Sequence, residues 1–189
     1  MRRIACALIH HPVLDRGAAV VTSAITNIDL HDISRSALSF GLSDFFVVHP
    51  VEAQRTLALR IRSHWVEGSG GKRIPDRMPA LGAMRVVSTL AEAIENLGAG
   101  ADGPVELWTT AARPSDTKPL TFTEGRSRIT AEGPPILVCF GTGWGLAPEI
   151  HAQAAFQLEP IRSPRADGYN HLSVRAAAAI IFDRLLGVS

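Results

Sequence analysis

Hydrophobic and polar positions alternate between two patterns along the chain. Short continuous apolar runs predict strands at residues 4–9, 45–48, 84–87, 105–109, 136–140 and 156–161. Helical spacing predicts helices at 32–40, 52–67 and 89–97, and a last one over 171–186 that Asn170 caps and Gly187 follows. Strands that alternate with helices indicate an α/β fold, a mainly parallel sheet covered by helices.

Length and composition predict a single domain. The chain has 189 residues, of which 46% are hydrophobic and 20% charged, so residues 1–189 are expected to form one globular unit with a substantial core. The longest apolar stretch, 176–182, is much shorter than the roughly 20 residues that cross a bilayer, and the first residues show no cleavage site. We therefore expect a soluble cytoplasmic protein without a membrane partner.

The two cysteines give no sign of a metal site. Cys6 and Cys139 each lie in an apolar run, and neither has the Cys or His spacing of metal ligands. Both are expected to be buried free thiols, and no metal cofactor is expected.

Charge is distributed unevenly although the net charge is only +1. Residues 54–85 carry +5 and the remainder of the chain −4. This window could bind an acidic polymer, or it could be a solvated helix face followed by a flexible connection at 68–73, where glycine and serine dominate.

A glycine-rich stretch, "CFGTGWGL", follows the apolar run that begins at Ile136. Glycines at alternate positions (Gly141, Gly143 and Gly145) allow unusual backbone angles and close approach of a ligand. A dinucleotide-binding loop is disfavoured, because only 48 residues follow Gly141 and Pro148 interrupts the next segment. A second suggestive stretch, 167–175, leads directly into an alanine-rich helix.

Together these stretches carry a family resemblance. "LVCFGTGWGLAPEI" and "ADGYNHLSVRAAAAIIFDRLLG" resemble the C-terminal half of SPOUT-class methyltransferases, and "TSAITNIDLHDISRSALSFGLSDFFVVHP" is similar to the N-terminal pattern of the class. The resemblance covers essentially the whole chain and is to the bacterial stand-alone family of S-adenosylmethionine-dependent RNA methyltransferases. It implies a SPOUT-like α/β domain with a C-terminal trefoil knot.

The resemblance also implies a cofactor pocket for S-adenosylmethionine, whose product would be S-adenosylhomocysteine. Glycine backbone and apolar walls suit an uncharged adenine. Trp144 could cover this pocket or the sulfonium, or it could be a packing or dimer-interface residue. Three loops would build the pocket, with the residues Trp108, Thr109, Thr110 and Ala111; Phe140, Gly141, Thr142, Gly143, Trp144, Gly145 and Leu146; and Ile161, Tyr169, Asn170, His171, Leu172 and Ser173.

Candidate catalytic residues are Arg35, Asp167, Asn170 and Ser173. Arg35 resembles an arginine that related enzymes place near the acceptor, but it could also pair with Asp32 on the helix surface. Asp167 could be a base or a turn residue, and Asn170 could be only a helix cap. The order Asn170-His171-Leu172-Ser173 departs by one residue from the pair found in ribose methyltransferases, which leaves a ribose oxygen and a base nitrogen open as acceptors.

Partners follow from the same resemblance. We expect an RNA substrate, gripped by the basic window or by Arg113, Arg126 and Arg128, and a homodimer that pairs through the first and last helices. The alternative is a non-catalytic module that binds an adenosyl ligand or RNA. Only 6% of residues are aromatic, and no basic and aromatic stripe predicts base stacking.

Overall fold

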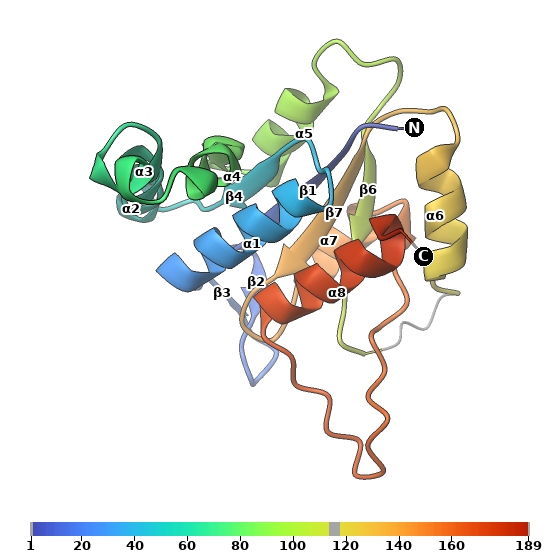
Figure 1. Cartoon of the computed structure of the whole chain (residues 1–189). Helices are drawn as coiled ribbons and strands as arrows, with labels where there is room; N and C mark the ends of the chain where they lie inside the picture. Colours follow the sequence, from blue (N-terminus) through green and yellow to red (C-terminus); the bar gives the residue numbers. More distant parts are fainter. Residues whose placement is uncertain (1, 114–117, 189) are drawn as a thin grey trace.

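A computed structural model describes residues 2–113 and 118–188 of the chain. Its main feature is a six-stranded sheet in the order β5-β4-β1-β7-β6-β8, in which every neighbouring pair is parallel (Figure 1). A short antiparallel hairpin, β2 and β3, stands apart from it. The strands are β1 (Ile4–Ile9), β2 (Val13–Leu14), β3 (Val20–Val21), β4 (Phe45–Val48), β5 (Met84–Val87), β6 (Glu106–Thr109), β7 (Ile136–Gly141) and β8 (Phe156–Gln157).

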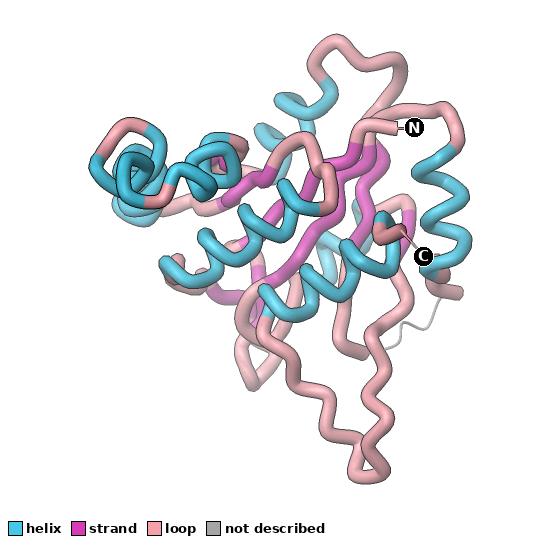
Figure 2. Tube along the Cα trace, in the orientation of Figure 1, coloured by secondary structure: helices cyan, strands magenta, loops and turns pink. Residues whose placement is uncertain are grey.

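Helices cover both faces of this sheet (Figure 2). Side chains at alternate positions of β1 point to opposite faces, as the period of a strand requires. Leu8 packs with α1, α6 and α8, whereas Ile9 packs with α5 and α7, so two hydrophobic cores form around one sheet. The helices are α1 (Asn27–Ser39), α2 (Glu52–Val66), α3 (Ser69–Arg73), the 3-10 turn η1 (Pro75–Arg77), α4 (Met78–Gly82), α5 (Leu90–Gly98), α6 (Phe122–Thr130), α7 (Pro148–Gln153) and α8 (Val174–Leu186).

The predicted α/β class and the strands β1, β4 and β5 are confirmed, as are β6 and β7 to within one residue. The run at 156–161 forms a strand only at its first two residues. Three predictions are wrong: residues 68–73 contain α3 rather than a flexible connection, the first helix begins at Asn27 and not at residue 32, and the last helix begins at Val174 and not at residue 171. Short helices such as α3, α4 and α7 have too few turns to show an apolar period, so their tertiary contacts decide them.

Threonine side chains cap the first turns of three helices. Thr26, Thr89 and Thr121 each accept a hydrogen bond from a backbone N–H in the first turn of α1, α5 and α6. Such caps satisfy donors that have no partner within the helix. Cys6 and Cys139 are buried free thiols as predicted, and burial raises the pKa of both.

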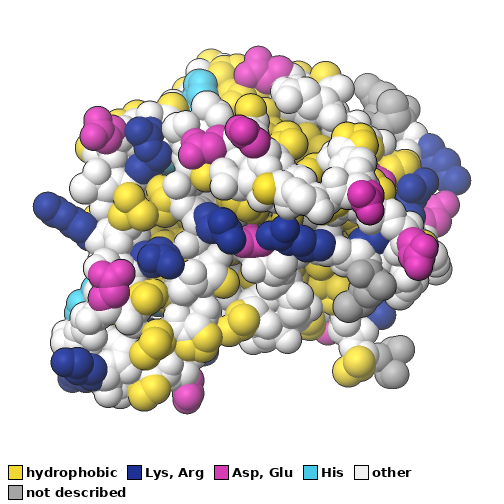
Figure 3. Space-filling view, turned by 90° about the horizontal axis from the view of Figure 1, so that it is seen from above, with side chains coloured by type: hydrophobic (Ala, Val, Ile, Leu, Met, Phe, Trp, Pro, Cys, Tyr) yellow, Lys and Arg dark blue, Asp and Glu magenta, His cyan; other side chains and the backbone are white. Residues whose placement is uncertain are grey.

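Most of the basic window serves the fold. Arg62 donates to the carbonyl oxygens of Gly82 and Met84, and Arg85 pairs with the buried Asp44. Arg77 lies over the ring of Trp65 at 5.0 Å. Seen from above, acidic and basic side chains are interspersed (Figure 3). With Arg55, which donates to the carbonyl oxygens of His49 and Pro50, four of the seven basic residues of this window make contacts within the chain.

Candidate functional site

Three loops emerge side by side at one edge of the sheet. Because β7, β6 and β8 are parallel neighbours, the segments after Thr109, Gly141 and Gln157 leave the sheet together, at the lower end of Figure 1. The backbone N–H and the hydroxyl of Thr110 both donate to the Cys139 carbonyl, at 3.1 and 2.9 Å. The N–H of Leu158 donates to the Thr109 carbonyl at 2.9 Å. The first residues of two of these loops are thus hydrogen-bonded to the neighbouring strands, Thr110 to β7 and Leu158 to β6.

The glycine loop needs its glycines for two different reasons. Gly143 and Gly145 have φ values of +60° and +111°, in the region that side chains disfavour. A Cβ on Gly143 would lie 2.8 Å from the carbonyl oxygen of Leu14, whereas one on Gly145 would meet no atom within 4 Å. Gly143 therefore serves packing within the protein, and only Gly145 borders open space.

The β2–β3 hairpin holds the glycine loop in place. Leu14 donates its N–H to the Gly145 carbonyl and accepts from the Trp144 N–H, both at 2.9 Å, and Val13 forms an antiparallel bridge with Leu146. The glycine loop is thus hydrogen-bonded along β2. The sequence does not predict this hairpin, because strands of two residues are too short to show an alternation of apolar and polar positions.

A chain of hydrogen bonds connects the glycine loop to a buried histidine. The Thr142 hydroxyl donates to the Ile9 carbonyl at 3.2 Å and therefore accepts from Ser23, which in turn accepts from Nδ1 of His10 at 3.0 Å. This order places the proton of His10 on Nδ1. Its Nε2 is a buried acceptor that has no partner among the described residues.

Burial keeps His10 neutral. Desolvation, together with charge repulsion from the neighbouring His49, whose ring centre lies 5.3 Å away, lowers the pKa of His10 to about 4. Nε2 of His49 donates to the Ser23 carbonyl, at 2.9 Å. A histidine pair behind β1 and β4 thus supports the glycine loop. Two histidines, His10 and His11, follow the first apolar run and are the only hint of this support in the sequence. The sequence does not show that β1 neighbours β7, which is what brings His10 close to Thr142.

The last loop is pinned at two points. Asn170 donates from its amide to the Ile161 carbonyl at 2.7 Å, so it closes the loop and does not cap α8. Ser173 is the cap, accepting from the Ala176 N–H at 3.3 Å. Asp167 accepts from Arg165 at 2.9 Å and from the Tyr169 N–H at 3.1 Å. The guanidinium lowers the pKa of Asp167, and the residue has the geometry of a turn.

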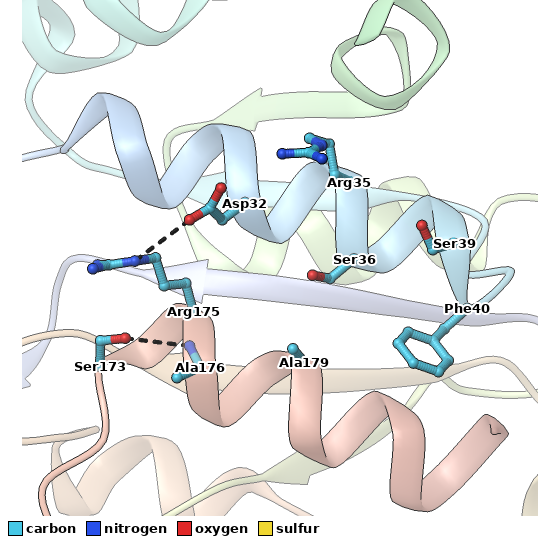
Figure 4. A pocket seen from close by; sticks show the side chains of 9 residues that line it. All are labelled: Asp32, Arg35, Ser36, Ser39, Phe40, Ser173, Arg175, Ala176 and Ala179. Atoms are coloured by element: carbon cyan, nitrogen blue, oxygen red, sulfur yellow. Dashed lines mark hydrogen bonds and ion pairs between the residues drawn. The ribbon is translucent and has the colours of Figure 1, made fainter. Parts of the chain in front are cut away.

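Arg35 and Ser173 line one groove of about 480 Å³ between α1 and α8 (Figure 4). Arg175 pairs with Asp29 and Asp32 at 3.2 and 3.5 Å, so the predicted pair of Arg35 with Asp32 is not formed. Within the part of the chain that the structure describes, no carboxylate lies within 4.0 Å of Arg35. Asp167 and Asn170 do not line this groove.

Some of the residues predicted to bind the cofactor have buried side chains, and others have side chains exposed to solvent. The side chains of Trp108, Phe140 and Leu146 are buried in the two cores, so only their backbone could reach a ligand. The Thr109 hydroxyl is bonded to Nδ1 of His151 at 3.0 Å. The side chains that remain exposed come from the glycine loop and the last loop: Trp144, Tyr169, His171, Leu172 and Ser173.

Two of the predicted RNA-gripping arginines have structural partners. Arg126 donates to three carbonyl oxygens at the end of α8, of Asp183, Arg184 and Gly187. Arg128 lies 4.0 Å over the ring of Phe156 and 3.7 Å from Glu106. Both arginines thus stabilise α6 and its neighbours, whereas Arg113 is exposed.

Searches for a metal cluster and for a membrane span gave negative results over residues 2–113 and 118–188. No group of three or more His, Cys, Asp and Glu side chains lies close enough to hold a metal ion. No helix in the same ranges is long and apolar enough to cross a membrane.

Comparison with known proteins adds a family. A sequence profile described as "SAM-dependent RNA methyltransferase" matches residues 3–187. A Nitratidesulfovibrio vulgaris protein named tRNA (guanine-N(1)-)-methyltransferase is 42% identical over 187 residues, which are 98% of this chain. The match covers 42% of that relative, so the chain spans less than half of its length.

Solved structures share the fold at low identity. TrmJ from Z. mobilis superposes with a TM-score of 0.62 and 19% identity, over 100% of this chain and 70% of that chain. The SpoU methyltransferase AviRb from Streptomyces viridochromogenes, in complex with the cofactor AdoMet, gives a TM-score of 0.56 and 13% identity over 98% and 57% of the two chains. These similarities confirm the predicted SPOUT-like fold.

Proposed function

The chain belongs to the family of SAM-dependent RNA methyltransferases, and from this premise we propose that it transfers a methyl group from S-adenosylmethionine to RNA and releases S-adenosylhomocysteine. The observation that carries the proposal is the convergence of the three loops at the edge formed by β7, β6 and β8. Membership in a family of enzymes favours this function over a non-catalytic module. The location that we propose is the cytoplasm, where an RNA substrate would be available.

The loops suit an adenosyl group. Open space in front of Gly145 lets a flat ring approach the backbone, and the half-buried Ile161 and the exposed Leu172 offer apolar walls. Trp144 and Tyr169 lie at the outer rim, and the buried side chains of Trp108, Phe140 and Leu146 shape the loops from behind. We therefore assign cofactor contacts chiefly to loop backbone at residues 109–111, 141–146 and 161.

The chain's own side chains position the acceptor. S-adenosylmethionine, when bound, supplies a methyl group on a positively charged sulfur. Arg35, which has no carboxylate within 4.0 Å in the described ranges, is available to hold an RNA phosphate. Ser173 offers a hydroxyl at the start of α8, and Asn170 fixes the loop that leads to it. Asp167 is a weak base, because Arg165 lowers its pKa, and we assign it to loop geometry.

We also propose a homodimer that pairs through the groove between α1 and α8. Arg35 points away from α8 at the rim of the groove, while the small Ala176 and Ala179 leave the space between the helices open (Figure 4). Pairing there would let Arg35 act in the site of the second copy. Light scattering at micromolar concentration should give twice the chain mass, and a monomer would contradict the proposal.

The C-terminal trefoil knot is part of the same proposal. β8 lies at the edge of the sheet, yet the chain returns through residues 158–173 to place α8 beside α1, over the middle of the sheet (Figure 1). The likeness to the SpoU methyltransferase fold supports threading of this return. An experimental structure in which the backbone is not knotted would contradict it.

Transfer RNA is the first substrate to test. The relative from Nitratidesulfovibrio vulgaris is named for methylation of tRNA at guanine N1, but this chain corresponds to only 42% of it. We propose tRNA as substrate and leave the methylated atom to be identified by mass spectrometry of the nucleosides. Tritium transfer from labelled cofactor to unmodified tRNA is the expected result, and absence of transfer to any cellular RNA would contradict the proposal.

The cofactor site can be tested by calorimetric titration with S-adenosylmethionine. Gly145→Ala places a methyl group in the open space beside the loop and should weaken cofactor binding tenfold or more. Gly103→Ala is the matched control, because Gly103 has a similar φ of +95° and only ordinary contacts around a Cβ, but lies before the start of β6, at the opposite end of the strands. Both variants should lose about 1–2 kcal/mol of stability.

A comparison of these two variants separates the effect of backbone strain from the effect of a methyl group in the cofactor site. Unchanged cofactor affinity in Gly145→Ala would remove the glycine loop from the cofactor pocket, and an equal loss in Gly103→Ala would show that backbone strain alone is responsible. Gly143 is less suitable, because a side chain there would collide with Leu14 and disturb the hairpin.

A further inference from the structure

The exposed aromatic side chains of this protein gather at one place. The chain has seven phenylalanines, three tryptophans and one tyrosine. All of these are buried or half-buried except Trp144 and Tyr169, whose exposed fractions are 54% and 64%. They come from different loops, 25 positions apart, and yet both contact the same side chain.

That side chain is His171. The Trp144 and His171 ring centres are 6.3 Å apart with an interplanar angle of 82°, and those of His171 and Tyr169 are 6.4 Å apart with an angle of 28°. We call these three residues the aromatic row. Leu172, 43% exposed, follows it directly in the chain. The row lies at the rim of the candidate cofactor site, because Trp144 belongs to the glycine loop and the other two to the last loop.

The loop that carries Tyr169 and His171 also contains a cation. Arg162 is exposed, and no carboxylate of residues 2–113 or 118–188 lies within 4.0 Å of its guanidinium. The other arginine of this loop, Arg165, is neutralised by Asp167. The hydrogen bond from Asn170 to the Ile161 carbonyl brings the backbone next to Arg162 to the residue before His171. A cation without a carboxylate partner in the same loop as exposed rings fits an anionic ligand that also has flat faces.

The exposure of Trp144 and Tyr169 at the rim of the candidate cofactor site is explained if a ligand covers these rings. Large aromatic side chains contribute most to stability when they are buried, so two rings left in water next to a reactive site indicate a ligand surface. RNA has both required groups, since unpaired bases stack on aromatic side chains and phosphates pair with arginine. Paired bases in an A-form helix do not offer their faces.

We propose that Trp144, His171 and Tyr169 form a stacking surface for an unpaired base of the RNA substrate, with Arg162 holding a nearby phosphate. This inference rests on the proposed function, and it adds that the substrate presents its target in a loop or single-stranded segment. The methyl acceptor is then brought to the cofactor loops by the same residues that frame them.

The test is binding of a fluorescein-labelled, single-stranded 12-nucleotide RNA, followed by anisotropy, with the same sequence in a duplex as comparison. Trp144→Ala and Tyr169→Ala should each weaken single-strand binding about tenfold or more, since base stacking on an aromatic ring is worth about 1–3 kcal/mol. Trp144→Phe, which keeps a ring, should restore most of the affinity. Leu59→Ala is the control, because Leu59 is 50% exposed on α2.

The molecular mass and the cofactor affinity of the same variants show why RNA binding is lost. The alanine variants should keep the mass of the wild type and bind S-adenosylmethionine within about twofold of it. A loss of cofactor affinity would place Trp144 in the cofactor pocket, a change in mass would make the row an interface between copies, and equal binding of duplex and single strand would remove stacking. Each of these outcomes overturns the proposal.

Arg162→Gln provides an independent check. Loss of one phosphate contact should lower the slope of log affinity against log salt by about one and weaken binding of all RNA sequences alike. An unchanged slope would overturn the role of Arg162. Failure of the proposed function looks different, because RNA would then bind through the row without receiving a methyl group.

Discussion

His10 shows how one buried side chain can set the geometry of a distant loop. Its Nδ1 proton begins a hydrogen-bond chain through Ser23 and Thr142 that ends at the Ile9 carbonyl. A protonated imidazole would place a charge on the buried Nε2, which has no acceptor within the described residues. The glycine loop therefore depends on a neutral histidine.

This dependence predicts a loss of stability in acid. The pKa of His10 falls from an ordinary 6.5 to about 4 on folding, so between these pH values the unfolded chain binds more protons. The stabilisation is complete above pH 6.5 and is lost as the pH falls toward 4, by about 3 kcal/mol. His31, His49 and His151, whose pKa values are also lowered by burial, add to the loss.

The contribution of His10 can be isolated by substitution. Urea unfolding of His10→Gln at pH 7 and pH 4.5 should show a smaller difference in free energy than the wild type. His11→Gln, at the exposed neighbouring position, is the control and should retain the wild-type difference. A difference in His10→Gln as large as that of the wild type would contradict the assignment.

At the scale of elements, the start of α8 differs from its prediction by three residues. Asn170 has the side chain of a good cap, but the Ile161 carbonyl takes its amide, so the loop continues to Ser173. Local sequence offers both residues as caps, and only the course of the preceding loop selects between them. This choice matters for function because it brings Ser173 to the end of the groove that Arg35 also lines.

Ser173 is predicted to have two separable roles. Ser173→Ala should cost about 1 kcal/mol of stability through loss of the cap, as should Thr89→Ala, which removes the cap of α5 far from the site. Ser173→Asn should restore stability, since asparagine caps well, but not methyl transfer, because the hydroxyl is absent. Methyl-transfer rates and thermal unfolding of the three variants check this.

The same variants can also contradict a role of Ser173 in methyl transfer. Full activity in Ser173→Asn would mean that Ser173 acts only as a cap and leaves the chemistry to other residues. Full activity in Thr89→Ala, with its similar stability loss, shows that stability alone does not limit the reaction.

At the scale of the whole molecule, folding redistributes charge. The basic window looked like a surface for an acidic polymer, but Arg62 and Arg85 satisfy the carbonyls and the buried Asp44 at neighbouring elements. Arg126 is likewise committed, to the end of α8. The two cations that we assign to RNA, Arg35 and Arg162, were not marked by any run of like charges in the sequence.

Aromatic residues show the opposite change. Their low number argued against base stacking, yet the fold buries or half-buries nine of them and gathers the two exposed ones around His171. Composition averages over the chain, whereas a binding surface needs only a few side chains that converge. Such convergence depends on which loops meet.

The sequence by itself determined the α/β class, the main strands and the position of the glycine loop, because apolar period and glycine spacing act over a few neighbouring residues. Its resemblance to a family also determined the cofactor class. Only the tertiary structure decided that β2 holds the glycine loop, that His10 supports Thr142, and that Trp144 meets His171. These pairings join residues far apart in the chain, and their positions depend on strand order, which no local pattern encodes.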